Sequence, residues 1–384
     1  MTTNTRIEDF LEKYQDNPQG GRRAMRLLSR ISNIPNNTLE NRLRNKDVLS
    51  GLASSMLQYR SQLDPSHDKH YTGDITFNAP WAGAYIDVEE DGWGYQKKFY
   101  GDKVLYGARI KGEYCLRRST VEGNNALRNG TLIGHEIFSM SVINGESVLR
   151  GATVRGTFTA CYTKINGCHA LADSVIEGEA GLYHTTIIGD DALKNSILSG
   201  DKVLSRTTVI GDRGLHSSHL VGTHALYYCQ LQGDSILSDS TIIGDENMIR
   251  STINGDNVLN NSYLEGDKIL HLSEIKGNYF LSNSTINGDD TMSFSSFEGD
   301  HMFNKTTVTG SSTFHHSDIS GLLPFEAAEL NTPQEGVTLQ EAHIYANAFK
   351  DAIVQPTQVD PSAEVNGYSF DEWYKMFVPI LNSS

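Results

Sequence analysis

Residues 255–277 read GDNVLNNSYLEGDKILHLSEIKG, and the Gly-Asp pair that opens this stretch returns after eleven residues. Gly255 and Gly266 are each followed by a leucine four places later, by a serine seven places later, and by a leucine or isoleucine nine places later. The stretch therefore contains a unit of eleven residues. It also raises the question whether one such unit, or a pair of them, makes the structural repeat.

The same spacing extends over more than half of the chain. Glycine occupies position 101 and every eleventh position through 321, without insertion or deletion, which defines twenty units. The fifth residue of each unit is Leu, Phe, Met or Ala, and the tenth is Ile, Val, Leu or Phe. The eighth residue is always small, most often serine. A fixed period of this kind is the signature of a repeat architecture.

Each unit is predicted to be extended rather than helical. Glycine at every eleventh position disfavours helix, and eleven residues are too few for a pair of helices. The eighth and tenth residues alternate with period two among β-branched neighbours, which indicates a short strand with one buried face. Glycine would supply a positive φ at the turn, and the aspartate that often follows it can bond nearby backbone N–H groups.

The seventh residue decides the length of the coil. Counted from Gly101, the odd units have mostly Gly, Asn, Asp or Ser at this position, whereas the even units have large side chains throughout. The first set readily adopts left-handed backbone, and the second set does so less easily. Alternate units therefore occupy different environments, and we expect a 22-residue coil with two unlike halves, repeated about ten times.

This pattern resembles that of the parallel β-helix, or β-solenoid, class. The resemblance implies an all-β solenoid core in which like residues stack along the rod about 4.8 Å apart. The pattern is similar in logic to calcium-binding β-rolls and pentapeptide-repeat rods. It lacks, however, the GGxGxD motif of the first and the five-residue period of the second, so it indicates a class and no specific family.

The segments that flank the array are predicted to cap it, because exposed ends of a β-ladder invite pairing with other chains. We expect a helical, basic N-terminal region over 1–70, an N-terminal cap over 71–100, the parallel β-helix over 101–321, and a C-terminal cap with short helices over 322–384. Capping boxes at 338–341 and 369–372 predict two helix starts, the first helix running to about residue 353.

Charge and hydropathy limit the possible locations and partners. The net charge is −15, which disfavours nucleic acid as a partner of the whole chain. No apolar run is long enough to span a membrane, and the first residues lack the apolar core of a signal peptide. We therefore expect no transmembrane segment. The location stays open between the cytoplasm and export by a route without a signal peptide.

The N-terminal region differs from the rest in charge. Positions 1–63 hold ten Lys or Arg and six Asp or Glu, so this basic head precedes an acidic body. Arg22, Arg26 and Arg30 are spaced to share one face of a predicted helix. They could meet an acidic partner, a lipid surface or the acidic body of the same chain.

The most informative candidate surface is the seventh position of the even units. Arginine, tyrosine and histidine predominate there, types that suit protein contacts, sugar stacking or phosphate binding. The alternative is that these residues only shield a corner of the coil, with Met140, Leu272 and Phe294 covering the core. The predicted partner-binding residues are Arg118, Tyr162, His184, Arg206, Tyr228 and Arg250.

No catalytic, metal or cofactor site is assigned from the sequence. The Gly-Asp column could bind calcium, but aspartate is also the ordinary residue beside a glycine turn. An array that runs from Gly101 to Gly321 without an insertion lacks the long loops from which catalytic clefts are usually built. Whether the chain is an enzyme stays open, although these features favour a non-catalytic protein.

Three hypotheses for function follow. The first is a non-catalytic binding scaffold, such as a secreted bacterial effector that engages a partner protein through the solenoid surface. The second is a glycan-directed β-helix enzyme or a phage fibre protein. The third is an acidic rod that mimics DNA, because residues 230–321 carry 13 acidic and 4 basic side chains. The expected partner is a protein, a glycan remains an alternative, and the oligomeric state stays open.

Overall fold

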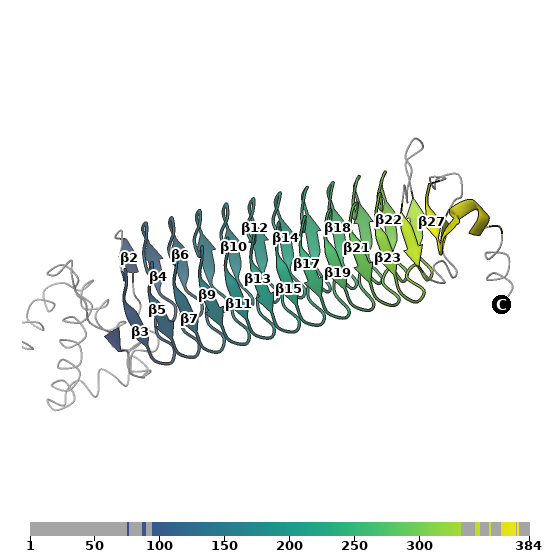
Figure 1. Cartoon of the computed structure of the whole chain (residues 1–384). Coiled ribbons are helices and arrows are strands. Elements are labelled where there is room, and N and C mark those ends of the chain that lie inside the picture. The colour runs from purple at the N-terminus through teal and green to yellow at the C-terminus, as the bar shows by residue number, and fades with distance from the viewer. Residues whose placement is uncertain are drawn as a thin grey trace, which may run out of the picture.

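The computed structural model describes residues 75–76, 87–89, 94–331, 342–345, 353–354, 362–373 and 375. In these residues the chain winds into an all-β parallel solenoid of about eleven coils, an elongated rod with a sheet along each of two sides (Figure 1). The prediction of a parallel β-helix is confirmed. The basic head and its predicted helices lie outside the described residues.

Two sheets run the length of the rod, and each coil contributes one strand to each sheet. Sheet A has 15 strands: β1 (Ile75–Thr76), β3 (Lys98–Tyr100), β5 (Thr120–Glu122), β7 (Val142–Asn144), β9 (Lys164–Asn166), β11 (Thr186–Ile188), β13 (Thr208–Ile210), β15 (Gln230–Gln232), β17 (Thr252–Asn254), β19 (Glu274–Lys276), β21 (Ser296–Glu298), β23 (Asp318–Ser320), β25 (His343–Tyr345), β27 (Glu364–Val365) and β28 (Tyr368–Ser369). Sheet B has 13 strands: β2 (Asp87–Glu89), β4 (Arg109–Lys111), β6 (Thr131–Ile133), β8 (Thr153–Arg155), β10 (Val175–Glu177), β12 (Ile197–Ser199), β14 (His219–Val221), β16 (Thr241–Ile243), β18 (Tyr263–Glu265), β20 (Thr285–Asn287), β22 (Thr307–Thr309), β24 (Glu329–Asn331) and β26 (Ile353–Val354).

The strand register confirms that two units make one coil. Thr186 of β11 pairs in parallel with Thr208 of β13, and Thr241 of β16 pairs with Tyr263 of β18. Residues eleven apart fall in opposite sheets, since even units supply sheet A and odd units supply sheet B. The two halves of each 22-residue coil therefore form the two sides of the rod.

The repeated glycine is required by the contact between coils. From Gly101 to Gly321 its φ lies between +127° and +159°, the region that side chains disfavour, which confirms the expected positive φ. A Cβ added to Gly244 would lie 2.4 Å from the carbonyl oxygen of Gly222, one coil earlier. Both the backbone conformation and the close stacking of glycine on glycine therefore exclude other residues.

The 22-residue coil is confirmed, but the expected difference in backbone between odd and even units at the seventh residue is wrong. Asn129 in an odd unit and Arg118 in an even unit share the same φ of 56°, and Tyr162 also has a φ of 56°. Left-handed backbone costs an ordinary residue roughly 1–2 kcal/mol. Since both halves of the coil need that conformation, the large residues of the even units are not explained by the backbone.

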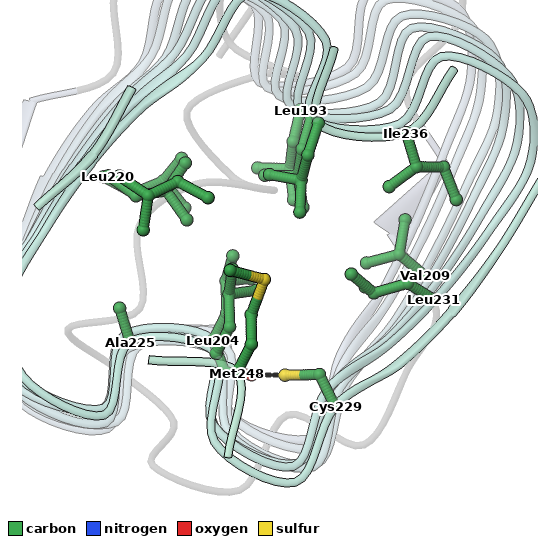
Figure 2. Close-up of a cluster of buried hydrophobic side chains, with 14 of the residues drawn as sticks. Leu193, Leu204, Val209, Leu220, Ala225, Cys229, Leu231, Ile236 and Met248 are labelled. Atoms are coloured by element: carbon green, nitrogen blue, oxygen red, sulfur yellow. Dashed lines mark hydrogen bonds between the residues drawn. The ribbon is translucent and has the colours of Figure 1, made fainter. Parts of the chain in front are cut away.

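The core is a set of apolar ladders. Leu204, a fifth residue, is fully buried, as are Val209 and Leu220 at tenth positions (Figure 2). The fourth residue of each unit also faces inward, as Ala225 and Ile236 show, and this further buried position was not predicted. Its side chain varies in size from glycine to phenylalanine, which hides its periodicity in the sequence.

The small eighth residue has a polar function inside the core. The Ser240 hydroxyl donates a hydrogen bond to the Leu215 carbonyl at 2.8 Å and accepts one from the Ser218 N–H at 3.1 Å, both in the preceding coil. Cys229 takes the same place, with its Sγ 2.9 Å from the Leu204 carbonyl oxygen. Serine and threonine thus satisfy buried backbone groups that the short strands leave unpaired.

The solenoid continues beyond the glycine-defined array at both ends. Phe99 in β3 is fully buried and lies 22 residues before Val121, in register with the tenth positions of the array, and β1 pairs with β3 through Ile75 and Phe99. After the array, Asp318 of β23 pairs with His343 of β25, whereas the regular register would place its partner at position 340. Strands therefore persist where the repeat has decayed.

The two helices expected near the C-terminus have different outcomes. The prediction of a helix over 338–353 is wrong where the structure describes this segment. Residues 343–345 form β25 and residues 353–354 form β26 at the ends of the two sheets. An open sheet edge offers hydrogen-bond partners that outweigh a local capping signal. The second capping box is confirmed. The Glu372 N–H donates to the Ser369 hydroxyl at 3.4 Å, and residues 370–373 are helical.

Truncating the core ladder should destabilise the rod. We expect Leu204→Ala to reduce the free energy of unfolding by about 2–5 kcal/mol, through lost burial and a cavity. The control is Leu272→Ala, whose side chain is 42% exposed, and it should change stability little. Urea unfolding followed by circular dichroism measures both, and equal costs would contradict the assignment of the fifth residue to the core.

Adding a methyl group at the glycine contact should cost more than left-handed backbone alone. Gly244→Ala combines a disfavoured φ of +130° with the Gly222 clash, so we expect a loss above the roughly 1–3 kcal/mol of backbone strain. Gly107→Ala is the control, because its φ is +67° with no atom within 4 Å of an added Cβ. Gly107→Ala should reduce the free energy of unfolding by roughly 1–2 kcal/mol. If both variants unfold at the same urea concentration, the stacking argument fails.

Candidate binding surface

The large seventh residues of the even units form one exposed ridge beside sheet A. We call this ridge the corner ladder. Each member lies two residues before a strand of sheet A, and successive members lie about 4.8 Å apart. All ten members are exposed: Arg118, Met140, Tyr162, His184, Arg206, Tyr228, Arg250, Leu272, Phe294 and His316.

The shielding alternative is not supported by the apolar members of the ladder. Met140 is 44% exposed, Leu272 is 42% exposed and Phe294 is 45% exposed, so each keeps a large part of its surface in solvent rather than entering the core. The side chains point outward from the same left-handed backbone as their polar neighbours. The ladder is therefore a surface feature along its whole length.

Rings and guanidinium groups stack on one another along the ladder. Tyr162 stacks on His184 with centroids 5.0 Å apart and planes 16° from parallel. The Tyr228 ring has Arg206 from the coil before it, 5.9 Å from the centroid, and Arg250 from the coil after it, 5.5 Å away. Arg250 Nη1 also donates a 2.7 Å hydrogen bond to the Tyr228 hydroxyl.

A shallow groove of about 350 Å³ runs beside the central part of the ladder. One side is formed by His184, Arg206 and Tyr228. The floor is formed by Thr185 and by the first residues of three adjacent strands of sheet A: Thr186, Thr208 and Gln230. Sequence reasoning missed these strand residues, although a polar row at the ninth position of three consecutive even units would have indicated them.

The ladder carries cations without carboxylate partners. Among the described residues, Arg206 and Arg250 form no ion pair, and Arg118 instead hydrogen-bonds the Tyr95 hydroxyl at 3.4 Å. Several arginines elsewhere on the rod are neutralised, as in the pairs of Arg150 with Asp173 and Arg155 with Glu177, both at 2.8 Å. The corner ladder is therefore a place on this acidic rod where positive charge stays unneutralised.

The structure places all six predicted binding residues on this ridge but does not bring them into one site. His184, Arg206 and Tyr228 line the groove, while Tyr162 and Arg250 extend the stack at its two ends. Arg118 lies four coils from Arg206 and contacts a different tyrosine. The basic-head residues Arg22, Arg26 and Arg30 lie outside the described residues.

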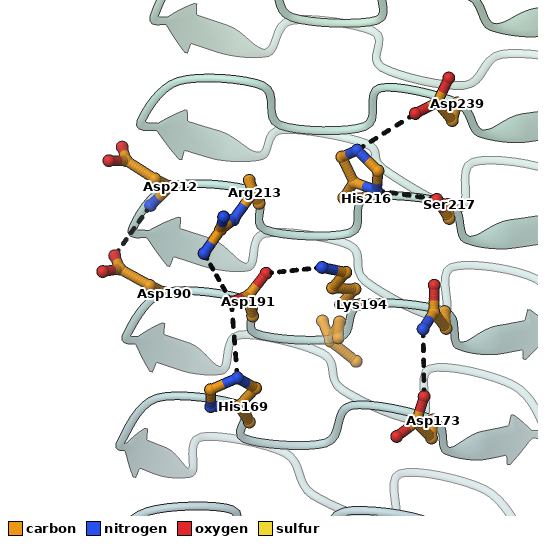
Figure 3. A network of polar contacts seen from close by, with 12 residues as sticks. His169, Asp173, Asp190, Asp191, Lys194, Asp212, Arg213, His216, Ser217 and Asp239 are labelled. Atoms are coloured by element: carbon orange, nitrogen blue, oxygen red, sulfur yellow. Dashed lines mark hydrogen bonds and ion pairs between the residues drawn. The ribbon is translucent and has the colours of Figure 1, made fainter.

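A second polar cluster lies on the odd-unit side of the rod, around Asp191 (Figure 3). The Asp191 carboxylate is 5% exposed and pairs with Arg213 at 2.8 Å, Lys194 at 3.1 Å and His169 at 3.5 Å. Burial raises the pKa of Asp191, but Lys194 and Arg213 outweigh it, so the pKa lies below its usual value. Because its charges are paired internally, we interpret this cluster as structural.

Aspartates of the Gly-Asp column accept hydrogen bonds from backbone N–H groups of the next coil. Asp190 Oδ1 accepts the Asp212 N–H at 3.0 Å (Figure 3). Asp212 Oδ1 in turn accepts the Asp234 N–H at 3.0 Å. The predicted bond to backbone N–H groups therefore forms between coils rather than within one turn. Within the described part of the chain, no three His, Cys, Asp or Glu side chains are grouped to hold a metal ion.

Two of the buried thiols are unsuited to nucleophilic chemistry. Burial raises the pKa of Cys161 and of Cys229 to about 12, so both stay protonated at neutral pH. Cys229 uses its sulfur in the serine ladder, as described above. Both cysteines are therefore part of the packing of the coil.

The fold defines the class of the protein as a parallel β-solenoid. Comparisons with protein-family models, with curated proteins and with solved structures find no match to this chain. In the residues that the structure describes, no helix has the length and apolar character needed to cross a membrane. The function therefore has to be argued from the surface itself.

The Asp191 cluster should make stability depend on acid pH. A carboxyl group with a lowered pKa in the folded state stabilises fully above its unfolded pKa, and this contribution is lost as pH falls through the folded value. We expect Asp191→Asn to lower the melting temperature at pH 7 and to reduce its further fall between about pH 5 and pH 2. Melting curves across this range provide the measurement.

The matched control for this prediction is Asp190→Asn. The neighbouring side chain is exposed, and an asparagine oxygen can still accept the Asp212 N–H. This variant should keep the pH profile of the unaltered protein. A profile for Asp191→Asn that parallels the unaltered protein would show that the carboxylate adds nothing to acid sensitivity.

Proposed function

We propose that this chain is a non-catalytic binding scaffold that engages a partner protein through the corner ladder. The observation that carries the proposal is the choice of residues at the seventh position. Both halves of the coil need left-handed backbone there, yet the even units place large, exposed side chains at that cost throughout, and the odd units do so only at Lys305. Arginine and tyrosine, which fill half of these positions in the even units, are enriched in binding hot spots.

The regularity of the coils supports the non-catalytic form of the proposal. From β3 to β22 every strand pairs with its counterpart 22 residues later, so the coils between 98 and 331 contain no inserted loop. Catalytic and binding residues of enzymes are commonly carried on such loops. A scaffold that binds through a row of side chains needs none.

The proposal includes the role of a secreted bacterial effector as one setting for such a scaffold. A rod with one adhesive corner can present several contacts at regular spacing to a single partner, which suits a protein that acts by binding alone. The basic head, with Arg22, Arg26 and Arg30, would be a second contact region in that setting. The identity of the bound partner decides between this setting and others.

The test compares two triple variants in stability and in partner binding. Arg206→Ala, Tyr228→Ala and Arg250→Ala together should leave the melting temperature nearly unchanged, because these side chains are exposed. Affinity for a partner captured by the unaltered chain should fall by more than about 2 kcal/mol, the usual hot-spot threshold. Titration calorimetry with the purified partner gives the value.

The control triple variant changes exposed seventh residues of the odd units. Asn261→Ala, Asn283→Ala and Lys305→Ala remove side chains of the same column type on the other side of the coil. This variant should bind the partner as the unaltered chain does. Unchanged affinity in the ladder variant, or an equal loss in both variants, would contradict binding through the corner ladder.

A further inference from the structure

We infer that the central part of the corner ladder takes an extended, acidic peptide segment of its partner, seated in the groove beside His184, Arg206 and Tyr228. This inference rests on the proposed function and adds the chemistry of the ligand. Three observations carry it: the hydrogen-bond donors grouped along the ladder, the unpaired charge, and the groups on the groove floor.

The central ladder offers several hydrogen-bond donors. His184 stacks on Tyr162, and the guanidinium carbons of Arg206 and Arg250 lie 5.9 and 5.5 Å from the centroid of the Tyr228 ring. Guanidinium N–H groups, an imidazole N–H and phenol hydroxyls are therefore grouped within neighbouring coils, and all of them can donate hydrogen bonds. A ligand rich in acceptors suits this set of groups.

The charge of the surface selects an anion. Arg206 and Arg250 carry no carboxylate partner among the described residues, although the whole chain has a net charge of −15. Guanidinium groups bind carboxylates with charge-assisted hydrogen bonds, which are stronger than neutral ones. A ligand with carboxylate side chains would therefore neutralise these two positive charges.

The groove floor suits a peptide backbone. Thr186, Thr208 and Gln230 stand side by side at the starts of β11, β13 and β15, where they offer hydroxyl and amide groups that both donate and accept. The stack from Tyr162 to Arg250 spans four coil steps, about 19 Å, which matches about six extended residues. Glutamates at alternate positions of such a segment would face the ladder together.

The short extent of the cationic stretch favours a peptide over a long polyanion. Of the ladder residues from Tyr162 to Arg250, only Arg206 and Arg250 carry a fixed positive charge. A nucleic acid or a polyuronate that ran along the rod would extend beyond these arginines over a chain with a net charge of −15. A peptide with a few acidic side chains can place its charge at the arginines alone.

The experiment uses the full chain and a fluorescein-labelled octapeptide of four Glu-Ser repeats. Fluorescence anisotropy should show binding that weakens as NaCl rises from about 50 to about 500 mM, because salt screens exposed charges. Arg206→Gln with Arg250→Gln should weaken binding at least tenfold. The matched control, Arg109→Gln with Lys111→Gln, removes the same charge from exposed positions on β4 in sheet B, and should retain the affinity.

Three comparison probes decide the chemistry of the ligand: the octapeptide of four Gln-Ser repeats, an oligogalacturonate and a single-stranded DNA octamer. The inference predicts that the glutamate peptide binds most tightly of the four. Equal binding of the glutamine peptide, tighter binding of either polyanion, or equal loss in the two double variants would overturn it.

The outcome remains separable from that of the proposed function. If the glutamate peptide does not bind while the alanine triple variant of the ladder still loses its partner, the acidic segment is wrong and the scaffold function stands. If the triple variant keeps its partner and the glutamate peptide also fails to bind, both the scaffold function and the acidic segment are wrong.

Discussion

The contact of glycine on glycine between successive coils is the constraint on which the rest of the structure depends. With an added Cβ only 1.8–2.4 Å from the carbonyl oxygen of the preceding coil at positions such as Gly321 and Gly244, no other residue fits there. This contact sets every coil directly over the one before it. The exact spacing of the glycines then keeps all other residues of the array in step from one coil to the next.

Stacking in register gives each side chain a copy of its own position as its nearest neighbour. In the interior this favours the leucine and isoleucine ladders, and it lets serine bond the backbone of the coil before it. On the aspartate column the carboxylates bond backbone N–H groups of the next coil. At the centre of the corner ladder Tyr228 lies between Arg206 and Arg250, which avoids the repulsion of like charges about 4.8 Å apart.

The two halves of the coil differ in chemistry while sharing one backbone. The odd half places mostly small polar residues at its left-handed seventh position, and charged groups pair internally around Asp191. The even half accepts the backbone cost and exposes arginine, tyrosine and histidine beside a groove. This asymmetry is the physical basis of the proposed binding function, since packing and turn formation would be served equally well by the odd pattern.

The sequence by itself determined the period, the 22-residue coil and the column of large seventh residues in the even units, because an exact repeat forces equivalent residues into equivalent places. Only the tertiary structure decided which atoms meet between coils. It showed that Asp190 accepts a hydrogen bond from the coil after it, and that Thr186, Thr208 and Gln230 line the floor of a groove. It also showed that residues 343–345 form a strand where the local sequence predicts a helix. Each of these depends on a partner at least one coil away along the chain, and local sequence preference does not report contacts at that distance.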